Sequence, residues 1–118
     1  MESKSLILAK SFLDKTVEVI MDRPMGIKHP KHTFKYEVNY GYIKNTLSPD
    51  GEELDAYFLG VDKPLERARG KVIAIIHRIG DDDDKLVVVP ESISLSDDEI
   101  MKQVHFQEQY FKSIVLRK

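Results

Sequence analysis

The sequence contains no cysteine, no long apolar run and no excess of charge of either sign, and each absence excludes a class of protein. Without cysteine there is no disulfide scaffold, no thiolate zinc site and no thiol nucleophile. No stretch approaches the roughly 18–20 apolar residues that a helix needs to cross a bilayer, so we expect no membrane partner. The 18 Lys and Arg residues nearly balance the 20 Asp and Glu residues. This balance argues against nucleic acid as a partner.

What is present describes a globular protein of 118 residues, 42% hydrophobic and 32% charged. A chain of this length is expected to form one domain, residues 1–118, with a core of its own. Its first residues lack a basic region followed by a small-residue cleavage site. We therefore expect a cytoplasmic protein rather than a secreted one.

The acidic residues are concentrated, because eight of the 20 fall within residues 50–55 and 81–84. Basic residues gather elsewhere, in residues 23–35, with two histidines among them. A charge run is usually a solvated loop. Two acidic clusters with one basic stretch also suit a site that holds metal cations and a polyanion together.

The first half of the chain shows both helical and strand periodicity. Apolar residues at helical spacing predict a helix over residues 3–13, with Ser3 as its N-cap. β-branched residues predict a strand over residues 16–21. Aromatic residues at even positions predict a strand over residues 34–43 with its rings on one face. Gly41 within this strand indicates a bulge or a close approach of another backbone.

The second half predicts strands followed by a helix. Residues 54–59 read as a short strand, and residues 71–79 and 86–89 as a hairpin with an acidic tip. A Ser-x-x-Glu capping box opens a predicted helix over residues 96–115. The order of helix, about five short strands and helix indicates an α+β, mainly β fold with a small barrel-like antiparallel sheet.

The segment 50–55 reads Asp-Gly-Glu-Glu-Leu-Asp and is the most informative part of the sequence. Asp50 and Glu52 share a face of an extended chain, and Asp55 joins them only if the chain turns, which Gly51 permits. Converging carboxylates repel one another unless they are protonated or neutralised, and hard cations such as Mg²⁺ are the usual neutralisers. A polar turn with scattered acids is the alternative.

Other residues offer oxygen ligands, a cation and a phenol that could act together with this segment. The tip Asp81–Asp84 offers further oxygen ligands, and Lys85 places a cation next to them for phosphate oxygens. In the motif Asn-Tyr-Gly-Tyr at residues 39–42, we predict a ligand role for Tyr40 and a packing role for Tyr42. The histidines lack the spacing of a zinc site.

In this order and at this spacing, the motif at residues 39–42 and the segment at 50–55 resemble the soluble family I inorganic pyrophosphatases. The acidic signature of that family is Asp, a small residue, Asp, Pro or Glu, an apolar residue and Asp. Five of the six positions fit, and Glu52 replaces the middle Asp. The resemblance covers most of residues 16–115. It implies a five-stranded OB-like barrel with N- and C-terminal helices that hydrolyses diphosphate with several Mg²⁺ ions, Mn²⁺ and Co²⁺ being substitutes.

The resemblance also implies roles for individual residues. Five acids would hold metal: Asp50, Glu52, Asp55, Asp81 and Asp83. Asp55 and Glu52 would help to activate the attacking water, and with Tyr40 they form the predicted catalytic group. Four residues would contact the substrate: Tyr40, Lys85, Tyr110 and Lys112. Bacterial relatives often form hexamers, so a homo-oligomer is expected.

Some features of the family have no match in this chain. Its Lys-x-Glu pair and the arginine before its tyrosine strand are missing, and its lysine after the last tyrosine is Phe111 here, with Lys112 one position on. Arg23, Lys28 and Lys31 could replace the lost cations. Two alternatives therefore stay open: a hydrolase of another phosphoanhydride at the same site, and a non-catalytic module, either a degenerate pyrophosphatase or an OB-like nucleic-acid binder that uses the aromatic strand.

Overall fold

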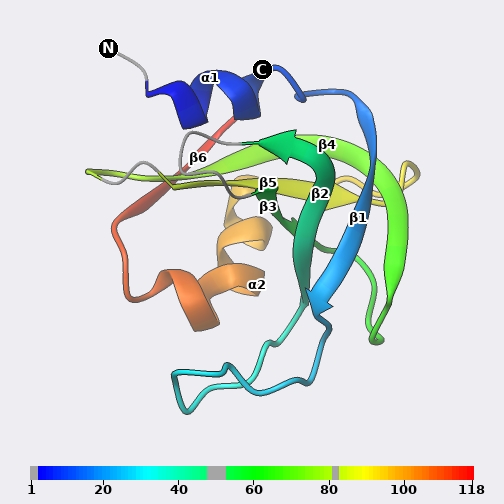
Figure 1. The fold of residues 1–118 in the computed structure, drawn as a ribbon, viewed down its shortest axis with the longest axis vertical. Helices are drawn as coiled ribbons and strands as arrows, with labels where there is room; N and C mark the ends of the chain where they lie inside the picture. The colour runs from blue at the N-terminus through cyan, green and yellow to red at the C-terminus, as the bar shows by residue number, and fades with distance from the viewer. Residues whose placement is uncertain (1–2, 48–52, 81–82) are drawn as a thin grey trace.

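A computed structural model of the chain describes residues 3–47, 53–80 and 83–118. Two helices and six strands follow one another as α1 (Lys4–Lys10), β1 (Thr16–Arg23), β2 (Asn39–Leu47), β3 (Glu53–Phe58), β4 (Arg67–Arg78), β5 (Asp84–Val89), α2 (Asp97–Glu108) and β6 (Ser113–Leu116). Figure 1 shows α1 above one end of the strands and α2 against one face of the sheet.

Five of the strands close into a barrel. The sheet runs in the order β1-β2-β3-β5-β4-β6, and a further pairing of β1 with β4 closes the ring. The prediction of a small five-stranded barrel with two helices is confirmed, with one correction to its strand directions. β3 and β5 run parallel, whereas the other neighbours in the sheet are antiparallel. Five is an odd number, so directions cannot alternate all the way round a closed ring.

The two faces of the barrel wall pack into separate apolar cores. Along β5, Leu86 and Val88 belong to the cluster that fills the barrel beneath α1, which contributes Leu6. Val87 and Val89 belong to a second cluster outside the barrel, beneath α2. Because both faces of this strand are covered, its sequence is a continuous apolar run rather than an alternating one.

Both helices begin with the predicted caps. The Ser3 hydroxyl oxygen accepts a hydrogen bond from the backbone N–H of Leu6 at 3.1 Å. Ser96 and Glu99 form a complete capping box at the start of α2. These caps satisfy backbone N–H groups that have no partner within the helix. In the part of the chain that the structure describes, no helix is both long and apolar enough to span a membrane.

The predicted helix over residues 96–115 is wrong at its C-terminal end. The helix α2 ends at Glu108, and residues 113–116 form the strand β6, in which Val115 pairs with Ile76 of β4. The edge of β4 offers backbone hydrogen bonds to any neighbouring extended segment. This tertiary pairing overrides the apolar spacing that favoured a longer helix.

The aromatic strand begins later than predicted. β2 starts at Asn39, so Phe34 and Tyr36 lie in the preceding loop, residues 24–38. The Asn39 side chain ties this loop to the barrel, because its Oδ1 accepts hydrogen bonds from the backbone N–H groups of Met25 and Leu65, both at 3.0 Å. The Tyr36 ring still stacks on the Tyr40 ring at 5.4 Å, as expected of side chains on a common surface.

Gly41 marks a close approach of two backbones, as the sequence predicts. A Cβ atom at this position would lie 1.9 Å from the carbonyl oxygen of Ile20 in β1.

We expect Gly41→Ala to lower the free energy of unfolding by roughly 1–3 kcal/mol, because the two strands must move apart. Urea unfolding measures this change. Lys44→Ala, an exposed position on the same strand, should stay within about 0.5 kcal/mol of the wild type. Equal stability of all three proteins would contradict the close contact.

Candidate active site

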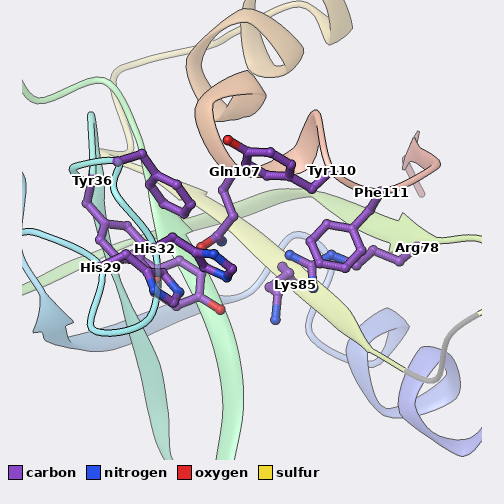
Figure 2. Close-up of a pocket in the computed structure, with 10 residues that line it drawn as sticks. His29, His32, Tyr36, Arg78, Lys85, Gln107, Tyr110 and Phe111 are labelled. Carbon is purple, nitrogen blue, oxygen red and sulfur yellow. The ribbon is translucent and has the colours of Figure 1, made fainter.

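A cavity of about 350 Å³ opens where the outer face of the barrel meets the loop 24–38 and the C-terminal end of α2. Its lining combines aromatic and imidazole rings with three polar side chains: His29, His32, Phe34, Tyr36, Tyr40, Arg78, Lys85, Gln107, Tyr110 and Phe111. Figure 2 shows Lys85 between the two histidines on one side and Arg78 with Phe111 on the other.

Lys85 joins two of the predicted metal ligands. Its Nζ donates hydrogen bonds to Asp55 Oδ2 at 2.9 Å and to Asp83 Oδ1 at 2.8 Å. The parallel pairing of β3 with β5 places Ala56 opposite Leu86, so the residues before them, Asp55 and Lys85, are neighbours on the α2 side of the sheet. The ammonium is buried, whereas the two carboxylates are 39% and 41% exposed and can reach a ligand from solvent.

Arg78 links the same cluster to α2. Its Nη1 donates to Asp83 Oδ2 at 3.0 Å, and its Nε and Nη2 donate to the two oxygens of Glu108 at 3.0 and 2.8 Å. The Phe111 ring covers the guanidinium, with its centre 3.7 Å from the guanidinium carbon. A planar fork of this kind is rigid. It fixes the end of α2 against β4 and thereby the wall of the cavity.

Glu108 is a buried carboxylate with a full set of donors. Besides Arg78, the Tyr57 hydroxyl donates to it at 2.6 Å and the Ser113 hydroxyl at 2.8 Å. Burial acts to raise the pKa of Glu108, but the hydrogen bonds from Arg78 and Tyr57 outweigh it and hold that pKa below its ordinary value. Glu108 is therefore ionised at neutral pH, and its charge is balanced by the guanidinium.

This lowered pKa predicts a dependence of stability on pH. The unfolded chain binds a proton at Glu108 near pH 4.5, above the pKa of the folded state. The stabilisation is therefore fully present above pH 4.5 and is lost as the pH falls through the folded pKa. We expect Glu108→Gln to cost about 1.5–3 kcal/mol at pH 7, and the difference from the wild type to shrink in acid. Urea unfolding from pH 7 to pH 3 measures it. A difference that stays constant would contradict ionisation of Glu108.

Tyr40 presents a protonated phenol at the cavity. Burial, followed by the nearby charge of Asp55, raises the pKa of Tyr40 well above 10. Its ring centre lies 5.7 Å from Lys85 Nζ. A phenol that stays protonated can only donate its proton to an anionic ligand as a hydrogen bond. The ligand role of Tyr40 stays a prediction.

The charged side chains around Lys85 and Arg78 that the structure describes carry a net negative charge. Two cations, Arg78 and Lys85, face three carboxylates, Asp55, Asp83 and Glu108, which leaves one net negative charge. A polyanion entering this cluster meets repulsion unless further cations accompany it.

The donor chemistry of the cluster suits such a cation. The exposed carboxylates of Asp55 and Asp83 are the oxygen ligands that Mg²⁺ prefers. Three other predicted metal ligands, Asp50, Glu52 and Asp81, lie outside the described residues. Within residues 3–47, 53–80 and 83–118, no group of three His, Asp or Glu side chains converges closely enough to hold a metal. Two of the five predicted ligands are thus brought together, and they fit a hard cation.

The structure places three of the four predicted substrate contacts at the cavity and the fourth away from it. Tyr40, Lys85 and Tyr110 line the cavity. Lys112 is exposed and is not among the lining residues, and its backbone carbonyl accepts a hydrogen bond from the Ile79 N–H at 2.8 Å. The side chain beside the guanidinium is Phe111 instead. The three cations considered as replacements, Arg23, Lys28 and Lys31, do not line the cavity either.

Sequence reasoning missed Arg78, Gln107 and Glu108. One signal for Arg78 was present, because it follows Ile76 at the spacing of residues on one face of a strand, and a charged residue on a buried face needs a partner. Gln107 donates to the Tyr57 hydroxyl at 2.6 Å. Nothing in the spacing of Gln107 or Glu108 pointed to Tyr57 or Arg78, since these contacts join residues at least 30 positions apart.

Comparison with known proteins identifies relatives of this chain. The family model described as inorganic pyrophosphatase matches residues 10–116. An inorganic pyrophosphatase of Neisseria meningitidis serogroup B is 30% identical over 96 residues, which are 69% of this chain and 54% of that protein. A second, from serogroup A, is 29% identical over the same shares of the two chains. This chain thus spans about half the length of the curated relatives that it matches.

Solved structures show the same fold. The inorganic pyrophosphatase of Ehrlichia chaffeensis superposes with a TM-score of 0.69 at 17% identity, covering 89% of this chain and 87% of that one. That of Neisseria gonorrhoeae superposes with a TM-score of 0.62 at 24% identity, covering 80% and 73%. The OB-like barrel is therefore shared with these proteins.

Proposed function

Because this chain belongs to the inorganic pyrophosphatase family, we propose that it hydrolyses inorganic diphosphate to two phosphate ions. The observation that carries the proposal is the cluster in which Lys85 is held between Asp55 and Asp83 at the wall of a cavity. Exposed carboxylates beside a buried ammonium can serve both a cation and a phosphate group.

The net negative charge of the cluster supports a requirement for metal. Asp55 and Asp83 would hold Mg²⁺ together with Asp50, Glu52 and Asp81, with Mn²⁺ or Co²⁺ as substitutes. When bound, such a cation neutralises phosphate oxygens and lowers the pKa of bound water.

The side chains of the cavity would orient the substrate. Lys85 Nζ and the Tyr40 hydroxyl are donors for phosphate oxygens, and Tyr110 extends the same wall. Asp55, with Glu52, would position the attacking water and accept its proton. Arg78 would act through Asp83 and Glu108, keeping the carboxylate and the end of α2 in place.

Release of phosphate tests the proposal directly. Purified protein with diphosphate and Mg²⁺ should release phosphate at a rate that rises with metal concentration and stops when EDTA is added. No release above a metal-only blank with Mg²⁺, Mn²⁺ and Co²⁺ would overturn the proposal. Cytoplasmic location and assembly into a homo-oligomer stay predictions of the sequence.

A second candidate is hydrolysis of another phosphoanhydride at the same site. The rings that line the cavity favour it, because a bare diphosphate has no apolar part for them to contact. The nucleic-acid alternative is less well supported, since the two cations beside the rings, Arg78 and Lys85, are already paired with carboxylates.

A further inference from the structure

The wall of the cavity is more aromatic than a bare diphosphate requires. Seven of its ten lining residues carry a ring, and only Arg78, Lys85 and Gln107 do not. Phosphate groups are bound through charge and hydrogen bonds. The volume of about 350 Å³ falls within the range of roughly 300–1,000 Å³ typical of pockets for organic ligands. The cavity therefore suits a phosphate compound that also has a planar apolar part.

Three of these rings lie close together with nearly parallel planes. His32 lies 5.5 Å from Phe34 at an interplanar angle of 10°, and 6.3 Å from Tyr110 at 12°. Phe34 and Tyr110 are 5.9 Å apart at 21°. Tyr110 is nevertheless 64% exposed. An aromatic ring that is stacked in common orientation and still open to solvent provides a surface on which a further planar ring can stack.

The three near-parallel rings and the phosphate-binding groups line one cavity. In the view of Figure 2, Tyr110 lies above His32 and Lys85, and all three line the cavity. His29 belongs to the same wall and lies 4.5 Å from His32. Loss of hydration, with the neighbouring positive charges, lowers the pKa of His29. At neutral pH this wall thus presents an uncharged ring at His29, and the Lys85 ammonium lines the same cavity.

We propose that the cavity recognises a nucleoside diphosphate, with its phosphates at Lys85 and its base stacked on Tyr110 and His32. This inference rests on the proposed function, because it uses the same phosphate-binding groups. The reaction is a hydrolysis: the oxygen of water bonds to the terminal phosphorus, the bridging oxygen leaves with the nucleoside monophosphate, and one proton is released. No oxidant, reductant or further reactant is needed.

Isothermal titration calorimetry in Mg²⁺ tests the inference without relying on turnover. The probes are ADP and methyl diphosphate, which share the phosphoanhydride but differ in the presence of a ring system. Stacking on one aromatic residue is worth about 1–3 kcal/mol, so we expect ADP to bind about 5- to 150-fold more tightly. Equal affinities, or no binding of either probe, would overturn the inference.

Variants separate stacking from hydrogen bonding. Tyr110→Leu should remove about tenfold of the advantage of ADP over methyl diphosphate, whereas Tyr110→Phe, which keeps the ring, should retain it. Tyr42→Leu alters a tyrosine that does not line the cavity and should leave the ratio unchanged. An unchanged ratio in Tyr110→Leu would also count against the inference.

The two proposals fail in different ways. Release of phosphate from diphosphate, with equal affinities for ADP and methyl diphosphate, would overturn the inference and leave the proposed function standing. Preferential binding of ADP without any release from diphosphate would overturn the proposed function and support recognition of the nucleoside diphosphate.

Discussion

Replacing Asp55 by asparagine is expected to lower the rate of phosphate release by about 10²–10⁴-fold, the usual contribution of a positioned general base. The amide has nearly the same shape as the carboxylate but carries no charge and does not accept a proton from water. Lys85 keeps Asp83 as a partner at 2.8 Å, so the variant should fold. Steady-state phosphate release at saturating Mg²⁺ measures the effect, and circular dichroism confirms the fold.

A matched variant shows whether the effect belongs to the site. Asp97 is also an ion-paired carboxylate, 2.8 Å from Arg117, but it lies at the start of α2 and its partner is not Lys85. Asp97→Asn should leave the rate unchanged, because exposed ion pairs of this kind contribute about 0–1 kcal/mol to stability. If both variants kept wild-type rates, Asp55 would have no part in the reaction.

Replacing Arg78 by methionine is expected to destabilise the protein by about 3–5 kcal/mol, the usual cost of removing one partner of a buried ion pair. Methionine occupies a similar volume but leaves the fully buried Glu108 carboxylate without its counter-charge. Such a loss is large against the roughly 5–15 kcal/mol by which domains are stable. Urea unfolding at pH 7 measures it.

A second substitution distinguishes the effect of the unpaired Glu108 charge from the effect of lost packing. In the double variant Arg78→Met with Glu108→Gln, neither charge of the buried Arg78–Glu108 pair remains, and the glutamine oxygen can still accept one of the hydrogen bonds that Tyr57 and Ser113 donate to the two carboxylate oxygens. We expect the double variant to be more stable than Arg78→Met alone. If the double variant is the less stable of the two, the cost arises from packing and not from an unpaired carboxylate.

The consequence of Arg78 for activity follows from its second contact. Arg78 Nη1 bonds the Asp83 oxygen that Lys85 does not contact, so one carboxylate is shared by both cations. The same guanidinium that stabilises α2 therefore also orients a predicted metal ligand. The site and the packing of α2 are therefore one connected set of charges.

Local patterns were sufficient for much of the fold. The Ser3 cap, the capping box at Ser96 and the strand over residues 16–21 each depend on neighbours within a few positions, where backbone geometry and side-chain chemistry act directly. At Gly41 the sequence predicted a bulge or a close approach of another backbone, and the structure shows the close approach. By contrast, the end of α2 and the start of β2 were set by partners far away in the chain.

The motif at residues 39–42 and the segment at 50–55, together with the resemblance that they carry, determined the family and the barrel from the sequence alone. They also predicted substrate contacts, of which three line the cavity: Tyr40, Lys85 and Tyr110. Only the tertiary structure decided that β3 runs parallel to β5, which brings Asp55 to Lys85, and that Glu108 closes on Arg78. Spacing along a chain predicts which residues share a face of a helix or strand. Spacing does not determine how strands far apart in the chain pair with one another. The burial of the two apolar cores decides that pairing.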